Sequence, residues 1–406
     1  MRNGTGPAAI LALLLATVVA TNAPAGTYYV ATDGKGENEG SEAKPWPSIS
    51  DELSKVGGGH IIIVKPGIYR GPFIFPRGTG GTKERPTIIK SEVKWKAVII
   101  GAESHCIFNG SDCDYVVVDG FEVHGAHKDG IKLAGDHNVV RNCWTHHNGA
   151  MGIAVHNRNG TVIENNLIEF NGAHPAFHHG IYACGEGLVV RGNIIRHNAA
   201  YGIHLYERVK NSIVANNLVY GQVNDVGILL YCEGDGHNTV VNNTSVGNRF
   251  GIYIHRGNGE VVKNNIVADN AMGNLVFSND SKNMDVDYNL CTPASEHQGP
   301  NGISGDPLFV DARRGAFWLR PGSPAIGTGT RGHAPATDFW GRRLPEDGPR
   351  DIGAFSFEPY LATGEARADW YENWAYRFAP GTHRGKSQDM VDLWRPPGKQ
   401  AGKAKN

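Results

Sequence analysis

The sequence lacks an excess of charge of either sign. It contains 39 Lys and Arg residues against 40 Asp and Glu residues, a formal net charge of −1 at pH 7. No overall electrostatic field therefore favours a nucleic acid or an anionic membrane as a partner. If the protein handles a polyanion, a local patch of cationic side chains must bind it.

Long apolar runs are also missing after the first 25 residues. Near the N-terminus, Arg2 is followed by an apolar stretch over residues 8–20 and by Ala23-Pro24-Ala25, the order of a secretory signal with its cleavage site. The stretch is shorter than the about 20 residues of a transmembrane helix, so we predict a signal peptide at residues 1–25. The chain is then expected to be secreted or periplasmic, with no membrane contact after cleavage; a membrane-anchored form is the alternative.

No Cys-x-x-Cys motif occurs, and no His and Cys residues show the spacing of a zinc site. The number of cysteines is even, which is compatible with an oxidising compartment. We nevertheless expect buried thiols, because free cysteine is among the most buried residue types. The six cysteines are Cys106, Cys113, Cys143, Cys184, Cys232 and Cys291.

Neither a long stripe of 3.6-residue periodicity nor a leucine ladder appears, which excludes helical and leucine-rich solenoids. The phrase Gly-Ile-x-aliphatic recurs instead, with successive glycines 22 to 28 residues apart. Six clear copies and a decayed seventh, GNLV, begin at Gly130, Gly152, Gly180, Gly202, Gly227, Gly251 and Gly273. A period of this length is typical of a solenoid.

A second phrase runs in step with the first and ends mostly in asparagine. Its copies end at Cys143, Asn166, Asn193, Asn217, Asn243, Asn265 and Asn289. Asparagine tolerates the left-handed backbone region, so it marks a corner, and stacked copies can pass amide hydrogen bonds between coils. We predict an all-β fold, a right-handed parallel β-helix with coils about 4.8 Å apart. An antiparallel sandwich that happens to repeat is the alternative.

Both ends of the repeat region resemble a known group of proteins. The segment TYYVATDGKGENEGSEAKPWPSISDEL, followed by GGGHIIIVKPGIYRG, is similar to the entry segment of secreted right-handed β-helix repeat proteins of the pectin-lyase-like superfamily. The resemblance implies a short amphipathic helix that caps the first coil. DPLFV, FWLRPGSPAIGTG and RDIGAFSFEP look like the exit segment of the same group. This superfamily includes polysaccharide lyases, glycoside hydrolases, uronate epimerases and structural adhesins, so the resemblance implies a fold and not one chemistry.

The predicted domains are a signal peptide (1–25), a β-helix (26–358) and a C-terminal tail (359–406). Within the β-helix we expect irregular early coils to residue 108, regular coils over 109–290 and closing coils over 291–358. In the tail, Trp370, Trp374 and Phe378 recur at helical spacing. They predict one amphipathic helix that docks on the solenoid, because an uncovered β-helix end invites edge pairing.

Alternation along the Gly-Ile-x-aliphatic strands predicts which side chains leave the solenoid. Residues two and four after each glycine point outward and form ladders on one face. The first ladder is Lys132, Ala154, Tyr182, His204, Leu229 and Tyr253, and the second is Ala134, His156, Cys184, Tyr206, Tyr231 and His255. One or two positions later follow Asn157, Glu207, Cys232, Arg256 and Glu233. So many His, Tyr, Glu, Arg and Lys residues on one face predict a functional site.

The coil between Gly152 and Gly180 is the longest and carries an insertion at residues 172–179. Insertions in repeat proteins fall in loops, often on the binding face, so we expect His178 and His179 to overhang the ladders. We predict no metal ligands and no cofactor. The alternative is a divalent cation held by His174, His178 and His179, a set that lacks a carboxylate at a recognised spacing.

These side-chain types suit β-elimination from a uronic acid. That reaction requires a cation beside the carboxylate, a base for the C5 proton and an acid for the departing O4. We assign catalysis to Tyr182, His204, His156 and Tyr206. The predicted substrate-binding residues are Lys132, His178, His179, Glu207, Tyr231, Glu233, Tyr253, His255 and Arg256.

The predicted function is that of a secreted, monomeric polysaccharide lyase acting on an acidic, uronate-containing polysaccharide. Three alternatives stay open. The same residues without the acid step give a C5-epimerase. Glu207 and Glu233 would serve a glycoside hydrolase as its carboxylate pair. A non-catalytic carbohydrate-binding or surface-structural β-helix would use the aromatic rings only for stacking.

Overall fold

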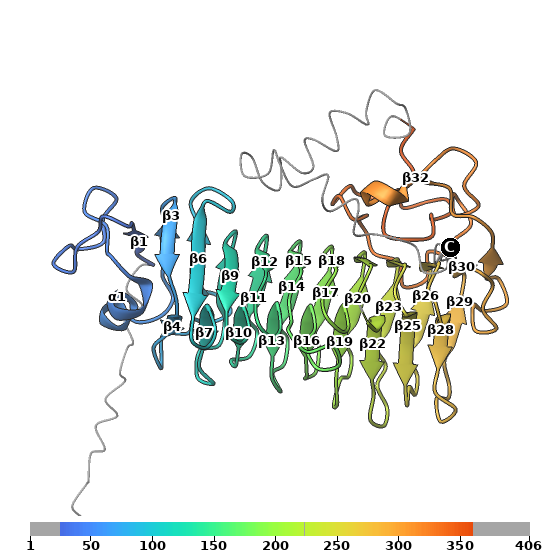
Figure 1. The fold of residues 1–406 in the computed structure, drawn as a ribbon, viewed down its shortest axis with the longest axis horizontal. Coiled ribbons are helices and arrows are strands. Elements are labelled where there is room, and N and C mark those ends of the chain that lie inside the picture. The colour runs from blue at the N-terminus through green and yellow to red at the C-terminus, as the bar shows by residue number, and fades with distance from the viewer. Residues whose placement is uncertain (1–24, 223, 360–406) are drawn as a thin grey trace, which may run out of the picture.

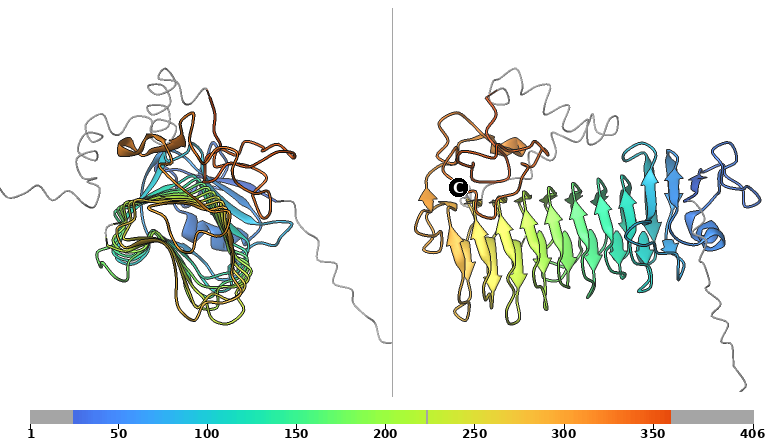
Figure 2. Two further views of the ribbon diagram at one scale, coloured as in Figure 1. Left: turned by 90° about the vertical axis from the view of Figure 1, so that its right-hand side faces the viewer. Right: turned by 180° about the vertical axis from the view of Figure 1, so that it is seen from behind.

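The chain winds into a parallel β-helix with three sheets, which confirms the predicted fold class (Figures 1 and 2). The structure is a computed structural model that describes residues 25–222 and 224–359. Each regular coil contributes one strand to the first, the second and the third sheet in turn, and each strand pairs with the equivalent strand of the next coil.

The first sheet consists of β1 (Thr27–Val30), β2 (Ile61–Val64), β5 (Thr87–Ser91), β8 (Val116–Asp119), β11 (Val139–Arg141), β14 (Val162–Glu164), β17 (Val189–Arg191), β20 (Ile213–Ala215), β23 (Thr239–Val241), β26 (Val261–Lys263) and β29 (Asp285–Asp287). The second sheet consists of β3 (Gly67–Arg70), β6 (Ala97–Ala102), β9 (Glu122–Ala126), β12 (Trp144–His146), β15 (Leu167–Glu169), β18 (Ile194–Arg196), β21 (Leu218–Tyr220), β24 (Thr244–Val246), β27 (Ile266–Ala268), β30 (Leu290–Thr292) and β31 (Ile303–Ser304). The third sheet consists of β4 (Phe73–Phe75), β7 (Ile107–Asn109), β10 (Ile131–Leu133), β13 (Ile153–Val155), β16 (Ile181–Ala183), β19 (Ile203–Leu205), β22 (Val226–Tyr231), β25 (Phe250–His255) and β28 (Gly273–Phe277).

The core is a column of aliphatic side chains that runs the length of the solenoid. On the third sheet, the isoleucines that follow the repeat glycines are register partners from coil to coil and fully buried: Ile131, Ile153, Ile181, Ile203, Ile228 and Ile252. Because side chains alternate along a strand, burying these residues sends their neighbours outward. The core thereby determines which residues line each outer face.

The asparagine corner between the first and second sheets is built as predicted. Asn166, Asn193, Asn217 and Asn243 are buried, and the backbone N–H and side-chain amide of Asn193 both donate to the Oδ1 of Asn217 at 3.0 Å. The residue before each asparagine has a positive φ, for example 54° at Asn216. A second ladder, which the sequence analysis did not predict, follows the second sheet through Asn148, Asn171, Asn198, Gln222, Asn248 and Asn270.

We expect Asn243→Ala to destabilise the fold strongly. The Asn243 side chain accepts from Asn217 and donates to the carbonyl of Val214 and to Asn265, all within the buried corner. Removing it leaves buried polar groups without hydrogen-bond partners, and each such group lowers the free energy of unfolding by about 1–3 kcal/mol. Urea unfolding followed by circular dichroism measures the loss, and Asn279→Ala at a surface loop serves as the control. A difference from wild type within about 0.5 kcal/mol, the usual size for a surface substitution, would contradict the ladder's role.

The N-terminal end of the solenoid is capped by the predicted helix, α1 (Ile49–Val56) (Figure 1). Ser48 is its N-cap, and the Ser48 side chain accepts from the backbone N–H of Ser50. Ile49 and Leu53 point into the first coil and are buried in the main core. The helix thus covers apolar side chains that no further coil would cover.

The C-terminal part differs from the expected closing coils over 291–358. Parallel pairing ends at β31, and the chain then folds back over the outer face of the second sheet (Figures 1 and 2). This closing segment contains an antiparallel pair, β32 (Phe309–Asp311) and β33 (Ala316–Leu319), joined by the 3-10 helix η1 (Ala312–Arg314). Its apolar side chains pack on those of the last coils of the second sheet in one cluster.

Corner asparagines on the solenoid also hold the closing segment. Asn264 donates to the carbonyl of Thr330 and accepts from its N–H, and Asn216 donates to the carbonyl of Thr337. The predicted signal sequence before residue 25 and the predicted tail helix with Trp370, Trp374 and Phe378 lie outside the described residues. Among those described, no helix is long and apolar enough to cross a membrane.

All six cysteines are buried free thiols, as predicted. Burial raises the pKa of Cys106, Cys143 and Cys291 to about 12. These thiols stay protonated at neutral pH and serve as small apolar core residues.

Candidate functional site on the third sheet

The first predicted ladder is present on the outer face of the third sheet. Its members are register partners in successive strands: Lys132, Ala154, Tyr182, His204, Leu229 and Tyr253. The decayed seventh repeat is shifted by one residue from the predicted alignment, because Gly273 pairs with Phe250 and not with Gly251. The ladder therefore continues with Val276, the partner of Tyr253.

The second ladder forms a row of rings beside the first. The ring centroids of Tyr206 and Tyr231 lie 5.0 Å apart, those of Tyr231 and His255 4.3 Å apart, and the ring of His156 lies 5.2 Å from that of Tyr182. Such rows suit stacking against flat, partly apolar ligands such as sugar rings. Cys184 interrupts this row as a buried thiol that forms a hydrogen bond with Tyr182.

The centre of the face is an aromatic cluster, which we define as His179, Tyr182, Tyr201, His204 and Tyr206. The His204 ring lies 4.7 Å from the rings of both His179 and Tyr201, 5.4 Å from Tyr182 and 5.1 Å from Tyr206. His204 points outward as predicted, but it is not exposed to water, since only 7% of its surface is accessible. The neighbouring rings cover it.

Hydrogen bonds define the protonation pattern of the two buried histidines. The backbone N–H of Tyr201 donates to Nδ1 of His179 at 3.3 Å, so the neutral ring of His179 carries its proton on Nε2. That Nε2 lies 3.1 Å from Nδ1 of His204, which must then accept. The His204 proton is consequently on its Nε2, an atom that is buried and has no hydrogen-bond partner among the described residues.

Both histidines are neutral near pH 7. Burial lowers the pKa of His179 to about 2 and that of His204 to about 3, and in His179 the neighbouring histidines act in the same direction. With its Nδ1 lone pair engaged and its Nε2 protonated, His204, one of the four residues assigned to catalysis from the sequence, cannot act as a base. It is a neutral donor beside Tyr182.

Tyr182 and His156 are both neutral, but Tyr182 carries a proton that it can donate and His156 is an imidazole that can accept one. Burial and the hydrogen bond to Cys184 raise the pKa of the Tyr182 hydroxyl above its usual range, so it keeps its proton. Burial and the positive charge of Lys132 lower the pKa of His156. His156 is therefore a neutral, half-buried imidazole next to a phenol that holds its proton firmly.

A third column precedes the repeat glycines, and the sequence analysis named only its member His179. In it, each side chain accepts the backbone N–H of the next coil's member. Asp129 Oδ1 accepts from Met151 at 3.0 Å, and His179 Nδ1 accepts from Tyr201. The members are His105, Asp129, Met151, His179 and Tyr201. The residue before each repeat glycine was the available signal.

Asp129 brings a negative charge to the face. It is 6% exposed and lies 3.2 Å from the Nδ1 of His105. Burial opposes its ionisation, but the contact with His105, the hydrogen bond from the backbone N–H of Met151 and the charge of Lys132 lower its pKa below the usual range. An anionic Asp129 thus stands close to Lys132 and His156.

Other predicted binding residues do not join this centre. Nδ1 of His178 accepts the backbone N–H groups of Ala173 and His174 and so supports its own loop. Because His179 turns to His204 instead, the three loop histidines do not converge on a cation. The one group of three metal-ligand side chains that converge within the described ranges lies on the second sheet.

The residues that follow the ladders form a rim. Glu207 and Arg256 occupy corners with positive φ, and Arg256 pairs with Asp280 at 3.2 Å. Glu233 is exposed. Lys132 and Arg256 are separated by five strand spacings, about 24 Å, so they cannot contact the same sugar unit.

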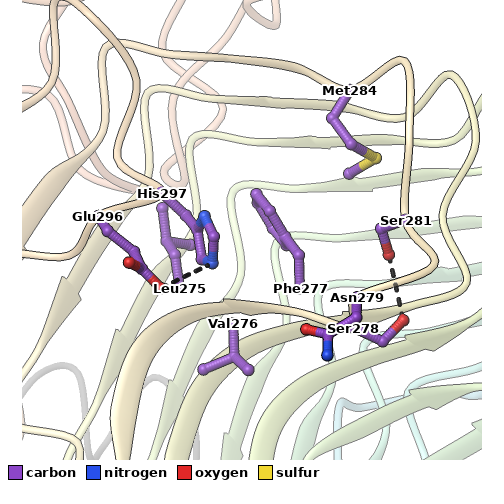
Figure 3. Close-up of a pocket in the computed structure, with 9 residues that line it drawn as sticks. All are labelled: Leu275, Val276, Phe277, Ser278, Asn279, Ser281, Met284, Glu296 and His297. Atoms are coloured by element: carbon purple, nitrogen blue, oxygen red, sulfur yellow. Dashed lines mark hydrogen bonds and ion pairs between the residues drawn. The ribbon is translucent and has the colours of Figure 1, made fainter.

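A pocket of 470 Å³ opens at the C-terminal end of the third sheet (Figure 3). Phe277 stacks on His297 at 4.8 Å on one side of it, and Ser278 contacts Ser281 on another. Met284, Glu296, Leu275, Val276 and Asn279 are the other residues that line it.

Comparison with known proteins agrees with this architecture. The family described as Pel9A-like, right handed beta helix region, matches residues 28–298. Pectate lyase L of Dickeya dadantii (strain 3937) is 33% identical over 148 residues, 32% of this chain and 33% of the relative. Pectate lyase L of Dickeya chrysanthemi is 29% identical over 147 residues, with the same coverage. The matches thus span about a third of the length of these relatives.

Solved structures show the same fold. The crystal structure of pectate lyase Pel9A has a TM-score of 0.61 at 18% identity and covers 82% of this chain and 96% of that one. A GH136 lacto-N-biosidase from Eubacterium ramulus has a TM-score of 0.50 at 14% identity, over 65% of this chain and 60% of its own. One solenoid architecture therefore occurs in a lyase and in a biosidase, and the chemistry must be argued from the side chains.

Proposed function

The chain belongs to the Pel9A-like right-handed β-helix family, and from that premise we propose that it is a polysaccharide lyase that cleaves a uronate-containing polymer by β-elimination. One observation carries the proposal. A neutral imidazole, His156, lies 5.2 Å from the ring of Tyr182, whose raised pKa keeps the phenol protonated, beside the positive charge of Lys132. Base, acid and cation are thereby gathered on neighbouring coils.

In the proposed reaction, Lys132 binds the carboxylate of the uronic acid and thereby acidifies the C5 proton. His156 takes that proton as the C5–H bond breaks. The electron pair forms the C4=C5 double bond while the C4–O4 bond breaks, and the Tyr182 hydroxyl protonates O4. His156 then returns its proton through solvent to the Tyr182 phenolate, so protons balance over one turnover.

The remaining members of the aromatic cluster position these groups. His179 and His204 form a neutral hydrogen-bonded pair whose rings pack against Tyr182 and limit its movement. Asp129 orients Lys132 by its charge. Tyr206, Tyr231 and His255 continue the face as a stacking surface for further sugar units, with Tyr253 beside them. The substrate we propose is an acidic polysaccharide. The protein would meet it outside the cytoplasm, as a secreted or periplasmic enzyme.

The proposal is tested by incubating the full chain with a panel of uronate polymers that includes pectate, alginate and a glycosaminoglycan. Elimination leaves an unsaturated, ultraviolet-absorbing sugar at the new non-reducing end. Saturated ends would show hydrolysis, and an unbroken polymer with altered C5 stereochemistry would show epimerisation. Binding without any change to the polymer would show a carbohydrate-binding protein. Each of these three outcomes would overturn the lyase.

Glu207→Gln and Glu233→Gln are expected to lower kcat by less than about tenfold. A glycosidase loses several orders of magnitude when either carboxylate of its pair is removed. Here Glu207 forms a hydrogen bond with Tyr206 and Glu233 is exposed, so we place both at the rim. Steady-state kinetics on the cleaved polymer decides the point, since near-complete inactivation of both folded variants would assign the site to a hydrolase.

A further inference from the structure

Three metal-ligand side chains converge on the outer face of the second sheet. Glu122 and His124 lie on β9, and His146 lies on the neighbouring strand β12 as the register partner of His124. Glu122 and His124 point to the same side because they are two residues apart on one strand. This trio stands on a different face from the proposed catalytic residues, and its interpretation does not depend on them.

The distances within the trio approach those of a coordination sphere. The three ligand atoms lie within 4.8 Å of one another, and Oε1 of Glu122 is already 3.3 Å from Nε2 of His146. Metal–ligand bonds of about 2.0–2.1 Å in a tetrahedral site place donor atoms about 3.3 Å apart. The trio therefore needs side-chain adjustments of at most about 1.5 Å, within the reach of small torsional changes.

Neighbouring side chains already orient His146. Its Nδ1 lies 2.8 Å from Nδ1 of His147, so the hydrogen bond at that nitrogen directs Nε2 toward Glu122. The rings of His124 and His146 are stacked at 4.8 Å, and Trp144 packs on His146 at 4.2 Å. A hydrogen bond at the second ring nitrogen is the usual way in which a ligating histidine is held.

We propose that Glu122, His124 and His146 form a binding site for a first-row transition ion of the zinc type. Two imidazoles and one carboxylate suit zinc and its neighbours, whereas calcium and magnesium prefer all-oxygen ligands. Three protein ligands leave a fourth position for water or an external group. Because the ligands come from two coils, the ion also cross-links β9 to β12 and stabilises this part of the solenoid.

The test uses the full chain purified without a histidine tag and stripped with a chelator. Zinc and cobalt(II) are added separately, and the bound metal is counted by elemental analysis after gel filtration. We expect one tightly bound equivalent per chain, a visible d–d spectrum for the cobalt form and a higher melting temperature with zinc. Glu122→Gln and His124→Gln should abolish the tight equivalent and the spectrum. His147→Ala should weaken binding by about 10–100-fold, because it removes the partner that orients His146.

His174→Gln, in the histidine-rich loop of the third sheet, is the matched control and should bind as wild type does. Glu122→Gln keeps the size of the side chain and a hydrogen-bond acceptor for His146, so it removes the metal ligand without removing the packing. Circular dichroism checks that the variant is folded. No tight equivalent in the wild type would overturn the proposal. Unchanged binding by Glu122→Gln and His124→Gln, or lost binding by His174→Gln, would overturn it as well.

Discussion

His156→Gln and Tyr182→Phe are each expected to lower kcat by about 10²–10⁴-fold, the usual contribution of one positioned proton-transfer group. His156→Gln removes the base, and Tyr182→Phe removes the only hydroxyl of that side chain but keeps its ring. KM should change much less than kcat, since stacking and the Lys132 contact persist. Initial rates of ultraviolet-absorbing product on the polymer identified by the panel give both constants.

Matched controls come from other faces of the solenoid. Tyr29→Phe on β1 and His237→Gln before β23 make the same chemical changes away from the third sheet, and both should retain full activity. Each variant must keep the wild-type circular dichroism spectrum. If folded His156→Gln or Tyr182→Phe kept more than a tenth of wild-type kcat, the assignment of base and acid would have to be withdrawn.

Local pattern predicted most of the architecture, because in a solenoid neighbours in space are equivalent positions in sequence. The period of the Gly-Ile-x-aliphatic phrase gave the strands of the third sheet, and the asparagine phrase gave the buried corner ladder. In both patterns each contact joins a residue to the equivalent residue in the next coil. The inward and outward columns followed from alternation alone, and the register of the first ladder is confirmed.

Burial of the outward residues could not be predicted in this way. Tyr201 and His179 come from the turn before their strands, and they cover His204 because of how that turn bends. The repeat period of the sequence does not predict the direction in which a side chain in a loop points. His204, assigned to catalysis from the sequence, is therefore a neutral, buried donor in the structure.

The closing segment was also beyond a repeat-based argument. Phe317, Trp318 and Phe355 belong to the segments that resemble an exit segment, within the region 291–358 where closing coils were expected. They instead pack on the outer face of the last coils of the second sheet, where residues such as Leu218 and Ile266 replace the usual polar exterior. Apolar residues on both faces of those strands were the signal that something covers them.

The neutral pair of His179 and His204 predicts a steep loss of stability in acid. A histidine whose pKa is lower in the folded than in the unfolded chain stays neutral while the unfolded chain takes up a proton. The contribution of such a histidine to the free energy of unfolding is fully present above its pKa in the unfolded chain, about 6.5. That contribution is lost as the pH falls toward its pKa in the folded chain. In the folded chain the pKa is about 2 for His179 and about 3 for His204. The pH window in which stability is lost therefore begins below about pH 6.5. It extends to pH values at which carboxylates also titrate.

Together the two histidines are expected to remove roughly 3 kcal/mol of unfolding free energy per pH unit within that window, about half of it from each. His204→Gln should reduce this slope by about half, because it removes one titrating group while its amide oxygen can still accept from His179. His237→Gln makes the same substitution at an exposed position away from the pair and serves as the control. Urea unfolding between pH 6 and pH 4.5 measures all three proteins, and equal slopes for wild type and His204→Gln would show that the pair is not held neutral. The same burial that withdraws His204 from proton transfer thereby makes it a determinant of acid stability.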